Sequence, residues 1–121
     1  MPTMVLEERF LCLDMLRVSW VNASGTTSRH CAILTEIWNS GALLQTDTSI
    51  PEGSKLTLAA PSGSIGARVN CCRQDSYGFL IQVTVDSPLS WFPTAYQPDR
   101  LIPKPPVLSP VSETLFASER R

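Results

Sequence analysis

The segment Ser64–Cys72 reads SIGARVNCC, and the segment Tyr77–Asp86 reads YGFLIQVTVD. Apolar side chains recur in both at every second position, which is the spacing of side chains on one face of a β-strand. On this pattern the core face carries Ile65, Ala67, Val69 and Cys71 from the first segment and Phe79, Ile81, Val83 and Val85 from the second. The short polar residues Gln74-Asp75-Ser76 between them are typical of a turn. The two segments are therefore predicted to form an antiparallel hairpin with one buried face.

Four more strands are predicted upstream, each bounded by residues that favour turns. They are Leu16–Val21, Arg29–Ile37, Ala42–Thr46 and Lys55–Ala60. At the turn Asn39-Ser40-Gly41, the asparagine and the glycine tolerate the positive φ that tight reversals need. Six strands spaced by roughly 8 to 12 residues are typical of a sandwich or a barrel. Because closure removes exposed strand edges, we predict a mainly β fold, a six-stranded antiparallel β-barrel.

The distribution of proline and apolar residues predicts three parts. Residues 1–14 are expected to form an N-terminal arm, in which Glu7–Met15 is either a short helix or extended. Residues 15–101 are expected to form the barrel, with the three aromatics of Ser87–Leu101 in a short helical turn or a strap that packs against it. Residues 102–121 are rich in proline and poor in apolar side chains, so we expect a disordered tail.

Composition excludes several classes of function. The chain has 121 residues with 10 Lys+Arg and 11 Asp+Glu, a formal net charge of −1, so it lacks the excess positive charge of a DNA- or RNA-binding protein. No apolar stretch approaches the ~20 residues of a membrane-spanning helix, and Glu7-Glu8-Arg9 interrupts the position of a signal peptide's apolar region. A soluble, cytoplasmic protein without membrane insertion is expected.

Residues for catalysis or metal binding are sparse. The four cysteines include no Cys-x-x-Cys spacing, so reduced structural thiols are expected, with no metal site and no cofactor. The single histidine, His30, is next to Cys31 in a predicted strand, where neighbours face opposite ways and cannot form a catalytic pair. We predict that the protein is not an enzyme and has no catalytic residues; an enzyme that uses His30 with a cysteine is the formal alternative.

The segment Thr35–Leu44, TEIWNSGALL, contains a strand end, a turn and a new strand. It resembles the PilZ domain family, whose hallmark at this junction is Asp or Asn, any residue, Ser, two residues and then Gly. The resemblance covers roughly Leu6–Pro88. It implies a six-stranded antiparallel barrel with a C-terminal helical piece. It also implies a bacterial signalling module that binds cyclic di-GMP, passes the signal to a partner and performs no chemistry.

Carried over residue by residue, the resemblance implies a ligand site made of Arg9, Glu36, Trp38 and Gly41. Glu36 stands where the family has Asp or Asn, Trp38 stands where it has Ser, and only Gly41 is retained. An indole donates a single hydrogen bond and is bulky, so it fills part of the pocket. Trp38 also has a structural interpretation, as an aromatic cap on the barrel mouth.

Nucleotide-binding members of the family also carry Arg-x-x-x-Arg before the first strand. Here Leu13 follows Arg9 at that spacing, and Val21 follows Arg17, so the pair is absent. Loss of one clamping guanidinium, worth ~1.5 to 3 kcal/mol, predicts binding weakened by roughly ten- to a hundredfold. The resemblance, with these departures from the family pattern, thus implies an adapter with a degenerate cyclic di-GMP site and a protein partner. The alternative is a functional cyclic di-GMP receptor in which Arg9, Arg17 or Arg29 contacts the phosphates.

Overall fold

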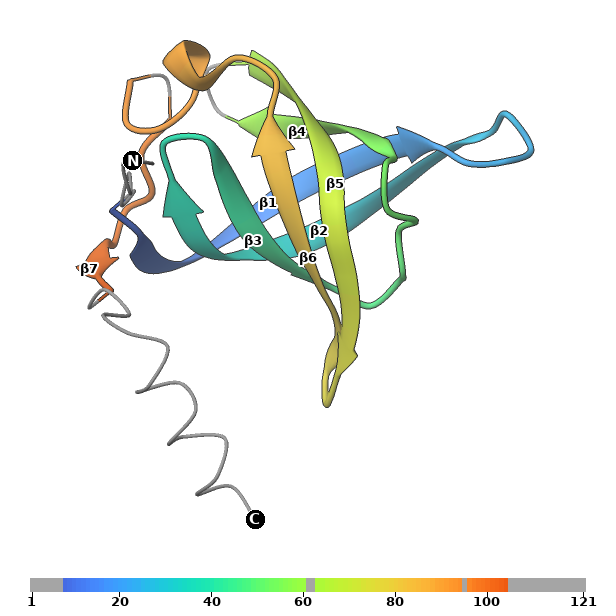
Figure 1. The fold of residues 1–121 in the computed structure, drawn as a ribbon, viewed down its shortest axis with the longest axis horizontal. Helices are drawn as coiled ribbons and strands as arrows, with labels where there is room; N and C mark the ends of the chain where they lie inside the picture. Colours follow the sequence, from blue (N-terminus) through green and yellow to red (C-terminus); the bar gives the residue numbers. More distant parts are fainter. Residues whose placement is uncertain (1–7, 61–62, 95, 105–121) are drawn as a thin grey trace, which may run out of the picture.

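The structure, a computed structural model, describes residues 8–60, 63–94 and 96–104. Six antiparallel strands form the wall of a barrel (Figure 1). They are β1 (Phe10–Val21), β2 (Thr27–Trp38), β3 (Gly41–Thr46), β4 (Lys55–Ala60), β5 (Gly63–Asp75) and β6 (Gly78–Val85). Around the wall the order is β2-β3-β6-β5-β4-β1, and β1 pairs with β2 to close it. The predicted six-stranded antiparallel barrel is confirmed.

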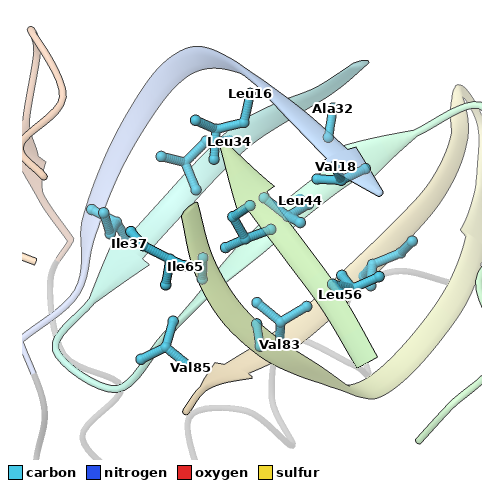
Figure 2. Close-up of a cluster of buried hydrophobic side chains, with 14 of the residues drawn as sticks. Leu16, Val18, Ala32, Leu34, Ile37, Leu44, Leu56, Ile65, Val83 and Val85 are labelled. Carbon is cyan, nitrogen blue, oxygen red and sulfur yellow. The ribbon is translucent and has the colours of Figure 1, made fainter. Parts of the chain in front are cut away.

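One face of every strand fills the barrel with aliphatic side chains (Figure 2). The side chains of Leu34, Ile37, Leu44, Leu58 and Ile81 are fully buried. Leu34 and Ile37 both reach this core although they are three residues apart. A register shift between β2 and β3 at this point offsets the alternation by one residue.

Strand boundaries differ from the prediction in every strand except β4, and the largest differences are in β1 and β5. β1 begins at Phe10 and not at Leu16, so residues 10–14 of the expected arm belong to the wall, and the helical alternative is wrong. The start of β1 has apolar side chains on both faces, so its sequence does not alternate between apolar and polar residues. Its pairing with β2 also shifts between Leu11 and Asp14. In β5 a register shift after Val69 pairs Cys72, and not Cys71, with the core residue Ile81.

The β5–β6 turn also differs, since it consists of Ser76 and Tyr77, with Asp75 paired to Gly78. The Asp75 carboxylate accepts a hydrogen bond from the Tyr77 N–H at 2.9 Å, which stabilises this reversal. Gly78 has a φ of 139°, and a Cβ on it would lie 2.3 Å from the Thr46 carbonyl oxygen. Only glycine fits this position.

The chain after β6 packs against one end of the barrel, as the aromatic residues predicted. It contains the 3₁₀ turn η1 (Pro88–Ser90) and buries Trp91, Phe92 and Tyr96. A seventh strand, β7 (Ile102–Pro103), then pairs with Phe10 and Leu11 at the start of β1 (Figure 1). β7 lies at the start of the tail expected over 102–121; residues 105–121 lie outside the described residues.

Among the residues that the structure describes, no helix has the length and the apolar character needed to cross a membrane.

Candidate functional site

The four predicted site residues lie together at one end of the barrel. Arg9 immediately precedes β1, Glu36 and Trp38 are near the end of β2, and Gly41 begins β3. Strand pairing joins Trp38 to Gly41, and the Arg9 side chain contacts both Glu36 and Trp38. A fifth residue, Lys104, reaches the same place from the segment after β7. We call these five residues the Glu36 cluster.

Glu36 is the centre of the cluster and is 9% exposed. Its Oε2 accepts a hydrogen bond from the Lys104 ammonium at 3.0 Å. Its Oε1 lies 3.8 Å from Arg9 Nη1, an ion-pair distance at which no hydrogen bond forms, and this oxygen has no hydrogen-bond partner among the described residues. Two cations from opposite ends of the chain therefore neutralise one buried carboxylate.

Trp38 is 3% exposed but is not part of the barrel core. It follows the core residue Ile37, so its side chain projects to the outer face, as that of Glu36 does. The Arg9 guanidinium carbon lies 3.9 Å from the centre of the indole ring, a cation–π contact. The family resemblance implies a serine hydroxyl at this position. In this chain the position holds the Trp38 indole, which lies beneath the Arg9 guanidinium.

The barrel mouth is closed by a different tryptophan. The Trp91 side chain is fully buried, and its Nε1–H donates to the carbonyl oxygens of Trp38, at 3.0 Å, and Gly41, at 3.1 Å. Gly41 does not have a positive φ, so the conformational reason predicted for it is wrong. A Cβ there would lie 2.2 Å from the Val83 carbonyl oxygen and 3.0 Å from Trp38 Nε1. Gly41 is required by close packing.

Hydrogen bonds attach Phe92 to the β2–β3 turn and Tyr96 to β1. Asn39 Nδ2 donates to the Phe92 carbonyl oxygen at 3.1 Å, and the Tyr96 hydroxyl donates to the Asp14 carboxylate at 2.5 Å. Burial and this hydrogen bond raise the pKa of Tyr96. Burial, with the nearby charges of Asp14 and Glu36, also raises the pKa of the Cys12 thiol to about 11. Both groups are held in their neutral forms next to the cluster.

Lys104 was not predicted as a site residue, because the sequence places it in a proline-rich segment. Its backbone N–H donates to the Arg9 carbonyl oxygen at 2.9 Å, and the pairing of β7 with β1 fixes the direction of the chain there. No local pattern around Lys104 predicts a contact with a residue 68 positions earlier. Only the closed fold brings the two together.

Two of the three arginines of the alternative receptor hypothesis, Arg17 and Arg29, lie away from the Glu36 cluster. Arg17 is opposite Cys31, and Arg29 is seven residues before Glu36 in β2, roughly 23 Å at ~3.3 Å per residue. Leu13, at the position of the family's second arginine, is 79% exposed. Of the three arginines only Arg9 belongs to the Glu36 cluster, where its side chain contacts Glu36 and Trp38.

His30 and Cys31 do not form a pair. The His30 ring stacks on the buried Trp20, with centroids 5.1 Å apart, whereas Cys31 is exposed on the other face of β2. Within the described part of the chain, no group of three or more His, Cys, Asp or Glu side chains is arranged to hold a metal ion. No protein-family model matches this sequence, and no curated protein matches it either.

Proposed function

We propose that this protein is a non-enzymatic, PilZ-like signalling adapter whose cyclic di-GMP position is filled by its own side chains and which acts by contact with a protein partner. One observation carries the proposal: the Glu36 carboxylate is held between Arg9 and Lys104 while Trp38 lies beneath Arg9. In a receptor, these groups would be free to bind the dinucleotide. Here they bind one another.

Entry of a dinucleotide would require several of these contacts to break at once. Lys104 would have to leave Glu36, and the buried carboxylate would then face the ligand phosphates with one neutralising charge fewer. A buried charge that loses its partner is strongly destabilising. The side chain that would be a second clamping arginine is Leu13, which offers no hydrogen bond in return.

The wall next to the cluster supports a role in protein contact. Leu13, Met15 and Ile102 are 79%, 68% and 59% exposed, and Leu11 and Ile33 are partly exposed nearby. Strand pairing places Met15 opposite Ile33 and Leu11 opposite Ile102, so the five side chains gather on adjoining strands. Apolar side chains gathered on an otherwise polar surface are typical of protein interaction sites. The aromatic side chains of Trp91, Phe92 and Tyr96 after β6 are buried, so they are not available for such a contact.

Calorimetric titration with cyclic di-GMP tests the first half of the proposal. We expect no saturable heat in the micromolar range, for the intact protein and for Arg9→Ala alike. Binding at low micromolar concentration or tighter would overturn the degenerate site. If that binding were lost in Arg9→Ala, the receptor would use the Glu36 cluster. If it were lost in Arg17→Ala or Arg29→Ala, the alternative receptor hypothesis would hold.

The proposed contact with a protein partner is tested by immobilising the chain and identifying the proteins from the source cells that bind to it. Leu13→Glu and Met15→Glu should each reduce a specific recovered protein at least tenfold, because a buried apolar side chain contributes ~1.5 to 3 kcal/mol. The matched control is Tyr77→Glu, which changes an 85% exposed residue in the β5–β6 turn. Equal loss in all three variants, or none in any, would exclude this surface as the contact.

A further inference from the structure

A groove lies on the outer face of β1, away from the Glu36 cluster. It has a volume of about 440 Å³ and lies between β2 on one side and β4 with the start of β5 on the other. Its lining includes the side chains of Arg17, Ser19, Arg29, Cys31, Thr57 and Ser64. A volume of this size is within the ~300 to 1,000 Å³ range of small-molecule sites.

Strand register brings the two arginines of the groove together. Arg17 pairs with Cys31 and Ser19 pairs with Arg29, so the two arginines are diagonal neighbours on one face of the β1–β2 ladder. Diagonal neighbours have Cβ atoms ~7 to 8 Å apart, which long side chains can bridge. Both guanidinium groups can therefore contact the same small anion.

The groove carries two arginines that have no counter-charge within the described part of the chain. Neither Arg17 nor Arg29 has an ion-pair or hydrogen-bond partner among the described residues, and the lining contains no carboxylate. The Asp86 carboxylate lies just outside the groove, next to Gly66 of β5, and Gly66 is paired with the lining residue Thr57. Two neighbouring like charges without a counter-charge repel each other, and a bound anion relieves that repulsion.

We propose that this groove binds a small molecule that carries phosphate groups. Two guanidiniums in fork geometry match phosphate oxygens, and the hydroxyls of Ser19, Thr57 and Ser64 add neutral donors around them. The exposed Cys31 is paired with Arg17 and lies two residues from Arg29 in β2. This inference goes beyond the proposed function and does not depend on it, since the Glu36 cluster is at the other end of β1 and β2.

The test is an NMR titration of the full chain with inorganic pyrophosphate, adenosine triphosphate and adenosine as separate probes. Saturable shifts of amides in 17–19, 29–31 and 57–59 and of the Ser64 amide are expected with both phosphate-bearing probes and not with adenosine. Arg17→Ala and Arg29→Ala should each weaken binding about tenfold, the effect of losing one charge-assisted hydrogen bond. The control, Arg73→Ala, changes an exposed arginine of β5 outside the groove and should bind as the unmodified chain does.

A second readout is alkylation by iodoacetamide, followed residue by residue by mass spectrometry. Pyrophosphate should slow the alkylation of Cys31 and leave Cys71 and Cys72, outside the groove, unchanged. If adenosine triphosphate binds more tightly than pyrophosphate, the groove recognises a nucleotide-like ligand. If the two bind equally, the groove recognises the phosphate groups alone. The absence of saturable shifts with either phosphate-bearing probe up to about 10 mM, or unchanged binding in both Arg17→Ala and Arg29→Ala, would overturn the proposal.

Discussion

Replacement of Lys104 by methionine should destabilise the barrel through the carboxylate that it leaves behind. Methionine keeps the length of the stem and removes the ammonium, so Glu36 loses its 3.0 Å hydrogen bond while only 11% of its side chain is exposed. A hydrogen bond to a charged group contributes ~1.5 to 3 kcal/mol, and the partial exposure of Lys104 places the expected loss near the lower limit, about 1.5 kcal/mol. For a domain of this size the melting temperature should fall by about 6 to 7 °C.

Urea unfolding followed by tryptophan fluorescence measures this loss. Lys55→Met is the matched control, because Lys55 is exposed on β4 and has no ion-pair partner among the described residues. Adding Glu36→Gln to Lys104→Met should restore part of the lost stability, since the buried charge is then removed. If Lys104→Met unfolded at the same urea concentration as Lys55→Met, Lys104 would not hold Glu36, and the argument for a filled nucleotide position would fail.

Three further outcomes are expected. Gly41→Ala should cost about 2 to 3 kcal/mol in urea unfolding, because its Cβ would lie 2.2 Å from the Val83 carbonyl oxygen; a cost below about 0.5 kcal/mol would contradict the packing argument. The raised pKa of Tyr96 means that its stabilising effect is present below pH about 10 and is lost as the pH rises further. The free energy of unfolding of Tyr96→Phe should therefore decline less steeply above pH about 10 than that of the unmodified protein. An identical decline in both would show that Tyr96 does not cause the loss of stability at alkaline pH. The Cys12 thiol, with its pKa raised to about 11 and its side chain buried, should react with iodoacetamide at pH 8 far more slowly than exposed Cys31, and similar rates would contradict its burial.

The sequence was sufficient to predict the strands whose position depends only on the alternation of apolar and polar side chains. The bounds predicted for β4, Lys55–Ala60, are those of the structure, and the alternation in Tyr77–Asp86 correctly predicts that Ile81, Val83 and Val85 of β6 are buried, with Phe79 partly buried on the same face. The aromatic residues after β6 were also correctly expected to need cover. In each case the deciding pattern is contained in a few neighbouring residues, so it can be recognised without knowing the partner strand.

Register shifts account for most of what the sequence did not predict. In β5 the shift after Val69 places Cys72 against the core, and in β2 the shift before Glu36 allows Leu34 and Ile37 to share one face. A bulge exists only relative to a partner strand, so no single segment encodes it visibly. Gly41 illustrates the same limit: the position was identified, but the close Val83 carbonyl that requires glycine lies on another strand.

The outer face of β1 connects the features on which the proposals depend. Before its first residue, Arg9 is bound within the Glu36 cluster. In its first half, Leu13 and Met15 are exposed and apolar, and at Arg17 the same face becomes the cationic wall of the groove. These outward residues are two apart, so substitutions can separate the three regions without altering the buried face. Met15→Glu and Arg17→Ala should therefore each change one binding property and leave the stability of the barrel unchanged, whereas a shared effect of both on unfolding would mean that the face is structural.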